Sequence, residues 1–427
     1  MKKIYNPKKD TWSKLLERPT QTVADIEETV LSVFNEIKTE GDFAVKRYTK
    51  KFDKVTLKNI LVSQNEIEEA SKLISEELKK AIRIAKSNIE KFHAAQKTDK
   101  IFVETTNGVS CWQEKRPIQK VGLYIPGGTA PLFSTILMLA VPANLAGCKE
   151  IVLCSPPNKE GNIDPAILYT ANLCGVTRIC KVGGIQAIAA MTFGTESIPQ
   201  VYKIFGPGNQ FVTVAKQLAT KFGVAIDMPA GPSELLVVAD DTANAAFVAS
   251  DLLSQAEHGK DSQVILVSTS KELIDTVEKE VEKQLLALPR KEIATAAIAN
   301  SKLIYVENDQ EALEIINEYG PEHFIVCVAN EDFYVENIAN AGSVFIGNYT
   351  PESAGDYASG TNHTLPTNGY AKQYSGVNLD SFMKSMTFQK ISEKGIQNIG
   401  NAIELMAAAE GLQAHKNAVT LRLESLK

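Results

Sequence analysis

The chain has 427 residues, of which 44% are hydrophobic and 22% are charged, a composition typical of soluble globular proteins. This length exceeds what one hydrophobic core usually serves, so we expect two large domains with extensions. The formal net charge of −6 argues against a nucleic-acid-binding protein, because phosphate contacts require a basic surface.

The sequence shows neither a targeting segment nor a cysteine motif. No apolar run follows the N-terminal stretch MKKIYNPKKD, and the longest apolar run, ILMLAVPANLAG, is too short to cross a bilayer. We therefore expect a cytoplasmic protein that does not bind membranes. The six cysteines have irregular spacings and no C-x-x-C, so we interpret them as core residues. Any metal would then be bound through nitrogen and oxygen.

Helices are predicted over roughly the first 100 residues. Ser63 and Glu66 have the spacing of a capping box, and apolar residues from Leu78 to Phe92 recur at helical spacing. The dipeptide Asn107-Gly108 then favours a tight hairpin turn.

From Lys120 onward, short apolar strands alternate with helical stretches, which is the pattern of parallel βαβ units. The predicted strands are VGLYI, EIVLC, RICKV and VYKIF, followed beyond residue 233 by ELLVV, QVILV, LIYV, HFIVC and SVFI. We expect two α/β sheets rather than one very large sheet.

Three glycine-bearing turns in the first of these sheets each follow a strand and precede a helix. They are Pro126-Gly127-Gly128, Gly183-Gly184 and Gly206-Pro207-Gly208-Asn209. Their backbone N–H groups are therefore expected at the carboxyl ends of strands, where ligands bind in such sheets.

The regular alternation ends after Ile346. Residues 347–369 have four glycines, two prolines and no apolar period, so we predict a structureless segment that is functional or disordered. Two helical stretches follow at 392–410 and 412–426, separated at Gly411. This tail has no sheet of its own to cover, so it must pack on another domain or subunit.

Gln255 and His258 lie at the end of a helix predicted from about Thr242 to His258. Both side chains would flank the buried stripe, where an unpaired polar group costs about 1–3 kcal/mol. Gly259 is expected to end the helix in the left-handed conformation. The pair could ligate a metal, or His258 could simply be favoured by the helix dipole. His93, on an earlier amphipathic helix, is predicted to be structural.

The stretch Gly320-Pro321-Glu322-His323-Phe324 opens a predicted strand. Neighbouring residues on a regular strand point to opposite faces, so Glu322 and His323 could converge only at its irregular start. Together they would form a pair for proton transfer. The alternative is a surface glutamate beside a histidine at the edge of the core.

Four further polar residues have ordinary structural explanations. Asp356 follows a glycine and is expected in a turn, where its carboxylate would bond its own backbone, and His363 would brace the same loop. Glu410 and His415 flank the helix break and would lie at a solvated helix terminus.

Seven separated stretches, in this order, resemble the histidinol dehydrogenase family, which completes histidine biosynthesis. They are GLYIPGGTAPLFSTILMLAVPANLAG, GPGNQFVTVAK, GPSELLVVAD, DLLSQAEHGKDSQ, GPEHF, GDYASGTNHTLPT and AEGLQAHKNAV. The resemblance runs from about residue 20 to the C-terminus. It implies an α/β fold with two incomplete Rossmann-like domains, a helical N-terminal extension and a helical C-terminal tail.

The same resemblance implies a domain order. Residues 1–20 would be the extension, 21–125 with 233–375 the domain of the metal and catalytic residues, 126–232 the NAD-binding domain, and 376–427 a tail exchanged between the subunits of a homodimer. No complete G-x-G-x-x-G is present, so a standard Rossmann pyrophosphate site is not predicted. The resemblance implies an incomplete Rossmann-like domain that would hold NAD loosely.

The resemblance also carries site residues over to this chain. One zinc ion per site would be bound by Gln255, His258, Asp356 and His415, and proton transfer would fall to Glu322 and His323. Substrate would contact Ser233, His323 and Glu410 as well as the four zinc ligands, and NAD would contact Tyr124, Gln186 and Asn209.

The implied reaction converts L-histidinol, two NAD⁺ and water into L-histidine and two NADH, with L-histidinal as the intermediate. Two other classes of protein stay open on the residues alone. A metal-assisted hydrolase would use the same ligands and the Glu322–His323 pair without a dinucleotide, and a non-catalytic module would bind an amino acid or metal without turnover.

Overall fold

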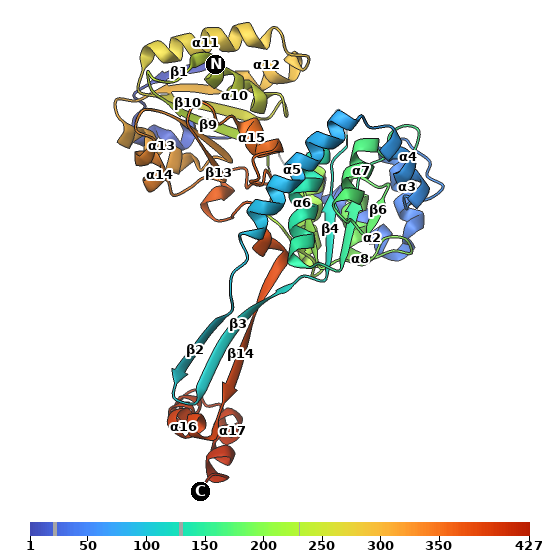
Figure 1. Ribbon diagram of the computed structural model, residues 1–427, viewed down its shortest axis with the longest axis vertical. Coiled ribbons are helices and arrows are strands. Elements are labelled where there is room, and N and C mark those ends of the chain that lie inside the picture. The colour runs from blue at the N-terminus through green and yellow to red at the C-terminus, as the bar shows by residue number, and fades with distance from the viewer. Residues whose placement is uncertain (20–23, 128–130, 230) are drawn as a thin grey trace. The chain divides into compact units, whose positions relative to one another are not determined.

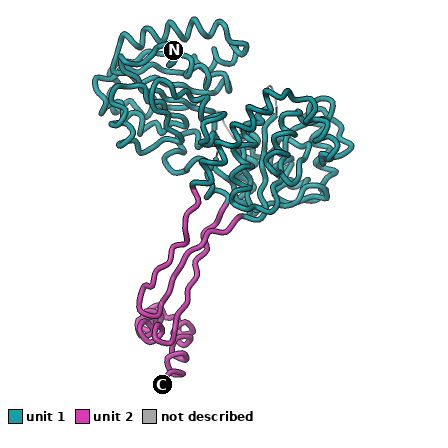
Figure 2. The backbone as a smooth tube through the Cα atoms, in the orientation of Figure 1, with its two compact units in different colours: residues 1–95, 118–382 teal, residues 96–117, 383–427 magenta. Residues whose placement is uncertain are grey.

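The computed structural model separates into two compact units (Figure 2). The described residues are 1–19, 24–127, 131–229 and 231–427, so Gly128 of the first predicted turn lies outside them. Unit 1 comprises Met1–Ala95 and Ile118–Phe382, and unit 2 comprises Gln96–Pro117 and Met383–Lys427. Among the described residues, no helix is long and apolar enough to span a bilayer.

Unit 1 contains a six-stranded parallel sheet in the order β1-β11-β10-β9-β12-β13 (Figure 1). In that order the strands are Lys2–Tyr5, Lys302–Tyr305, Gln263–Ser268, Glu234–Ala239, His323–Cys327 and Ser343–Ile346. Every residue of β9, β10 and β12 is buried, as expected for parallel strands covered on both faces.

Helices cover both faces of this sheet. One face packs against α10 (Ala245–Ala256), α11 (Lys271–Leu285) and α12 (Lys291–Ala299). The other face packs against α1 (Trp12–Leu15), α13 (Asp309–Tyr319) and α14 (Glu331–Asn337). Leu235 and Val237 of β9 point into the first core and Leu236 into the second, because side chains alternate along a strand.

Unit 1 also contains a five-stranded parallel sheet in the order β6-β5-β4-β7-β8. In that order the strands are Arg178–Cys180, Glu150–Cys154, Lys120–Tyr124, Lys203–Phe205 and Ala225–Ile226. Its helices are α6 (Phe133–Ala146), α7 (Pro165–Leu173), α8 (Gly184–Phe193) and α9 (Gln210–Lys221). The strand order reverses between β4 and β7, which opens a crevice at their carboxyl ends.

The N-terminal helices accompany the five-stranded sheet. They are α2 (Ala24–Glu40), α3 (Asp42–Phe52), α4 (Gln64–Lys72) and α5 (Glu76–Ala94). Helix α2 packs on α8 and α9, α4 on α7, and α5 on α6. This grouping differs from the one drawn from the sequence, where residues 21–125 accompany residues 233–375; the domain boundaries stay a prediction. The predicted capping box of Ser63 and Glu66 is confirmed at the start of α4.

Unit 2 is built on a three-stranded antiparallel sheet in the order β14-β3-β2. The strands are Met383–Ile391, Val109–Pro117 and Ile101–Thr106. The predicted hairpin at Asn107-Gly108 is confirmed, with Gly108 at φ 82°, and Trp112 stacks on Phe388 at 5.2 Å between ring centroids. The two predicted tail helices are α16 (Glu393–Ala409) and α17 (Gln413–Glu424), separated at Gly411.

The predicted α/β class and two parallel sheets are confirmed. All nine strands predicted after Lys120 are present. The prediction that residues 347–369 are structureless is wrong in one part, because residues Glu352–Tyr357 form a short helix, α15, beside α10.

Candidate active site

A cluster of polar side chains lies at the amino ends of two neighbouring strands of the six-stranded sheet. His323 is the first residue of β12, and Ser233 directly precedes β9, its neighbour in the sheet. Gln255 reaches this point from the last turn of α10. The cluster therefore draws on segments that are far apart in sequence.

Glu322 and His323 converge at the irregular start of β12. Nδ1 of His323 lies 3.7 Å from Oε2 of Glu322, and the same oxygen accepts hydrogen bonds from the Glu234 N–H at 2.8 Å and from Nε2 of Gln255 at 3.2 Å. Glu322 is buried, so the alternative of a surface glutamate is wrong. A carboxylate fixed by two donors beside an imidazole is suited to moving protons.

His323 lies among three carboxylates. Besides Glu322, its ring nitrogens approach Oε1 of Glu352 at 3.9 Å and Oδ1 of Asp356 at 3.5 Å. Burial alone would lower the pKa of His323, but the charges of Glu352 and Glu322 and the contact with Asp356 raise it well above the usual value. The surrounding carboxyl groups therefore stabilise the imidazolium form of His323.

The neighbouring carboxyl groups differ from each other. Burial raises the pKa of Glu352 well above its usual value. For Asp356, burial acts in the same direction, but the contact with His323 outweighs it and lowers the pKa. One of the two carboxyl groups of α15 thus favours the protonated form and the other favours the anion.

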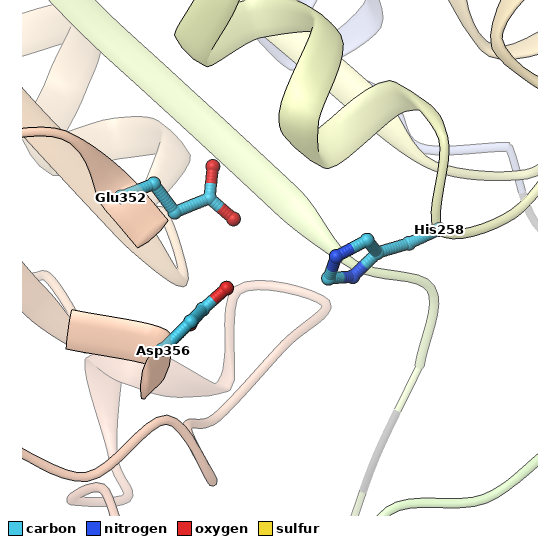
Figure 3. A group of neighbouring side chains, drawn as sticks. All are labelled: His258, Glu352 and Asp356. Atoms are coloured by element: carbon cyan, nitrogen blue, oxygen red, sulfur yellow. The ribbon is translucent and has the colours of Figure 1, made fainter. Parts of the chain in front are cut away.

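His258, Glu352 and Asp356 form a group suited to a metal ion, with ligand atoms all within 4.8 Å of one another. Figure 3 shows the two carboxylates of α15 and the imidazole from the loop after α10 pointing toward one another. Imidazole and carboxylate together suit zinc and several other divalent ions. The turn predicted for Asp356 is wrong, because the residue lies on α15.

Glu352 is the member of this group that sequence reasoning missed. It precedes Asp356 by four residues, the spacing that brings two side chains to one face of a helix. The signal was hidden because the segment was expected to have no helix.

Three buried polar atoms of the cluster have no hydrogen-bond partner among the described residues. They are Oε1 of Gln255, Nε2 of His323 and Oε1 of Glu352. Buried polar atoms in native proteins are nearly always paired, so these atoms point to a ligand or cation that completes their environment. The donor set thus fits a divalent metal with a polar substrate.

A cavity of about 630 Å³ adjoins this cluster. Ser233 and His258 line it together with Asn209 and Phe211 of the five-stranded-sheet region. The cavity is large enough for a small polar substrate, and it places His258 of the candidate metal group next to the glycine turn after β7.

A second cavity, of about 710 Å³, lies at the carboxyl ends of the five-stranded sheet. All three residues expected to contact NAD, Tyr124, Gln186 and Asn209, line it. Because Asn209 and Phe211 line both cavities, a ligand of the second cavity can reach the first.

Two residues that line the second cavity are held by hydrogen bonds to backbone N–H groups. The Tyr124 hydroxyl accepts a hydrogen bond from the Gly184 N–H at 3.1 Å, and Oδ1 of Asn209 caps α9 through the Val212 N–H. Gly206, at φ 126°, allows a close approach, because an added Cβ would lie 2.1 Å from the Tyr124 carbonyl oxygen.

Other predicted residues have structural surroundings. His93 is buried with Nδ1 at 2.8 Å from the Ile89 carbonyl, and His363 braces its loop as expected, with Nδ1 at 2.8 Å from the Asp356 carbonyl oxygen. Gly259 does not adopt a positive φ, so the predicted left-handed cap is wrong; α10 ends at Ala256 and the next turn keeps right-handed geometry.

Glu410 and His415 belong to unit 2. Glu410 follows α16 and His415 lies in the first turn of α17, and both are exposed there.

The chain is similar to proteins of one family along its length. The family model described as histidinol dehydrogenase matches residues 16–423. Histidinol dehydrogenase of Bacteroides thetaiotaomicron is 61% identical over 427 residues, covering 100% of both chains, and that of Escherichia coli strain K12 is 54% identical over 417 residues, covering 97% of this chain and 95% of its own.

A solved structure agrees with these relatives. The crystal structure of histidinol dehydrogenase from Elizabethkingia anophelis superposes with a TM-score of 0.98 at 60% identity, covering 100% of this chain and 98% of that one. These matches favour neither a hydrolase nor a non-catalytic binding module. The chain belongs to the histidinol dehydrogenase family.

Proposed function

We propose that this protein oxidises L-histidinol to L-histidine through L-histidinal, using two NAD⁺ and one zinc ion per site. The observation that carries the proposal is the buried His323 among carboxylates, beside unpartnered polar atoms and a cavity that shares Asn209 with a second cavity. Alcohol oxidation requires a proton acceptor, a fixed substrate and a nearby nicotinamide, and this arrangement offers a place for each.

Gln255, His258 and Asp356 would hold the zinc, with His415 of the partner subunit as the fourth protein ligand. Oε1 of Gln255 suits this role because it is buried and has no hydrogen-bond partner in the described part of the chain. When bound, the zinc would fix the substrate through its amino and imidazole nitrogens. The mixed nitrogen and oxygen donors are also compatible with Mn²⁺ or Co²⁺.

His323 would act as the base in both oxidations. In the first, it takes the hydroxyl proton while the carbinol carbon gives its hydride to NAD⁺, which leaves the aldehyde and one NADH. In the second, it takes a proton from the hydrated aldehyde while the same carbon gives a second hydride, which leaves the carboxylic acid and a second NADH. The carboxyl groups of Glu322, Glu352 and Asp356 lie within 3.9 Å of its ring nitrogens and would stabilise the imidazolium that forms when it accepts each proton.

Glu322 would activate the water that hydrates the aldehyde between these steps. The Glu234 N–H and Nε2 of Gln255 both donate to Oε2 of Glu322, and these two hydrogen bonds fix the carboxylate beside His323. Ser233, in the cavity wall, and Glu410 would contact the substrate.

The nicotinamide dinucleotide would occupy the cavity lined by Tyr124, Gln186 and Asn209. Its nicotinamide ring would approach the substrate past Asn209 and Phe211, which line both cavities. The hydride path would therefore cross the wall that the two cavities share.

The protein would act as a homodimer in which unit 2 completes the partner's site. Mixing His258→Ala chains with His415→Ala chains tests this directly. A heterodimer can then contain one site with all four ligands, so partial activity should return; no recovery would argue against shared sites.

The metal requirement is tested by dialysis against a chelator followed by addition of zinc. Metal analysis should show loss and return of one zinc per chain, and histidinol-dependent NADH formation should fall and recover in parallel. Full activity in protein shown to lack metal would contradict the proposal.

A further inference from the structure

Asp53 is a carboxylate in the second cavity, called the nucleotide cavity below, and the proposed reaction gives it no role. It is the C-cap of α3, with its N–H bonded to the Thr49 carbonyl oxygen at 2.9 Å. Its side chain lines the same cavity as Tyr124 and Gln186. Oδ2 of Asp53 accepts a hydrogen bond from Nε2 of Gln186 at 3.1 Å.

This carboxylate is only partly satisfied. Within the described ranges it has the one side-chain partner, Gln186, and no ion pair. A carboxylate accepts about four hydrogen bonds, so Asp53 retains capacity for more. Oε1 of Gln186 is also buried, and no described residue bonds to it. Burial, opposed by the Gln186 contact, raises the pKa of Asp53 to about 6.

We propose that Asp53, positioned by Gln186, accepts hydrogen bonds from the adenosine ribose hydroxyls of NAD and thereby selects NAD over NADP. This inference rests on the proposed use of NAD. In many dinucleotide-binding folds an acidic residue binds the ribose in this way, but there it follows the second strand of the sheet. Here the acid comes from α3, a helix that precedes the whole five-stranded sheet.

The adenosine ribose is assigned to Asp53 from the way the two cavities meet. The nicotinamide ring must lie close to the substrate, and the two cavities share Asn209 and Phe211. Asp53 and Gln186 line the nucleotide cavity but not the substrate cavity. They therefore lie beside the half of the ligand that is farther from the reacting carbon.

A carboxylate at this position discriminates against NADP by charge. The 2′-phosphate of NADP replaces one ribose hydroxyl with a group of about two negative charges, so it loses a donor and meets a like charge. Lys159 also lines this cavity, so the cavity as a whole does not repel phosphate and the discrimination must be local.

The test compares Asp53→Asn with the wild-type protein in two measurements. Calorimetry gives the affinities for ADP-ribose and 2′-phospho-ADP-ribose, and kinetics give kcat/KM for NAD and NADP with histidinol. Loss of one charge-assisted hydrogen bond should weaken ADP-ribose binding about tenfold. The preference for the unphosphorylated ligand should fall by about tenfold or more, since the repulsion is also removed.

Asp164 provides a matched control. It lines the same cavity, but its Oδ1 caps α7 through the Ala166 N–H at 2.8 Å. Asp164→Asn removes one negative charge and keeps a capping side chain. The preference between NAD and NADP should stay unchanged in this variant; an equal shift would mean that only the net charge of the cavity matters, which overturns the inference.

Two further outcomes separate this inference from the proposed function. Wild-type protein that forms no NADH from histidinol would refute the proposed function itself. Active wild-type protein combined with unchanged ADP-ribose affinity in Asp53→Asn would refute the role of Asp53 alone. Asp53→Ser also lacks the carboxylate and serves as a second variant if Asp53→Asn disturbs the fold. Its preference for the unphosphorylated ligand should fall as well.

Discussion

The two cavities of unit 1 are built on opposite principles. The substrate side lies at the amino ends of β9 and β12 and concentrates charge: three carboxylates surround one buried histidine, and three polar atoms have no partner among the described residues. The nucleotide side lies at the carboxyl ends of β4 and β7. Its Tyr124 and Asn209 are neutral and already bonded to backbone N–H groups.

The difference shows which of the two cavities depends on its ligands to balance buried charge. Buried charges are costly without a partner, so the substrate side is complete only with a cation and a polar substrate. On the nucleotide side Asp53 keeps its hydrogen bond from Gln186 when the ligand leaves, so release leaves less unpaired charge than it would on the substrate side. Such a division suits a reaction in which the substrate must stay bound while the dinucleotide is exchanged.

The largest expected effect comes from replacing His323, the proposed proton acceptor on the substrate side. His323→Asn should lower kcat for histidinol and for histidinal by about 10²–10⁴-fold, because both oxidations lose their proton acceptor. Steady-state kinetics with each substrate measure this. Zinc content should be unchanged, and loss of zinc in the variant would instead assign His323 to metal binding.

Glu322→Gln sharpens the same result. If Glu322 activates water, the variant should lose histidinal oxidation chiefly, while histidinol is still converted to the aldehyde. Equal losses in both half-reactions would refute this division between the two residues.

Next in size is the contribution of Glu352 to the metal group. Glu352→Gln removes a carboxyl oxygen that lies within 4.8 Å of ligand atoms of His258 and Asp356 and that a bound cation would ionise, so zinc affinity should fall by about 10–100-fold. A competition titration with a chelator measures this. The control is Glu257→Gln, beside His258 but outside the group, which should retain zinc like the wild type; equal retention by the Glu352 variant would exclude that residue from the site.

The cost of burying charge on the substrate side is tested by Asp251 of α10. Burial raises its pKa from 3.8 to about 7, so its contribution to stability is present below about pH 4 and is lost as pH rises through 7. Asp251→Asn avoids that loss and still accepts a hydrogen bond. The variant should gain about 2 kcal/mol in free energy of unfolding over wild type at pH 8.

Denaturant unfolding at pH 4 and pH 8 separates this from a general effect. The advantage of Asp251→Asn should be small at pH 4, and Asp241→Asn, at an exposed site before α10, should show none at either pH. An equal gain at both pH values would mean that the charge of Asp251 is not its cause.

The smallest effect is expected on the nucleotide side. Tyr124→Phe leaves the Gly184 N–H without its partner but removes no charge, so NAD binding should weaken by about 1 kcal/mol, or roughly fivefold in KM. The rate constant kcat should hardly change. A loss of kcat comparable with that of His323→Asn would remove the contrast between the two sides.

The sequence predicted most of the regular fold because parallel strands are short apolar runs that need no partner to be seen. The pattern of apolar runs did not predict strands β1, β8 and β14. Strand β14 is largely exposed, and it pairs with β3, which lies more than 260 residues earlier, so local pattern cannot reveal it. The helix periodicity of residues 24–94 showed buried faces but not which sheet covers them.

The candidate site was predicted mostly through family resemblance rather than through the residues. Gln255 and Glu322 are separated by 67 residues yet share a hydrogen bond of 3.2 Å, and no spacing rule anticipates that. Glu352 was missed because a six-residue helix hides in a glycine-rich segment. Burial lowers the pKa of His323 and the surrounding carboxyl groups raise it, and both effects arise only in the folded chain.

The proposed oxidation through two hydride transfers is tested by counting the NADH formed per histidinol. Zinc-loaded protein is given limiting L-histidinol and excess NAD⁺, and the reaction is followed to completion by nicotinamide absorbance. We expect two NADH for each histidinol, with L-histidine as the product. A single NADH with free aldehyde as the product would contradict this expectation.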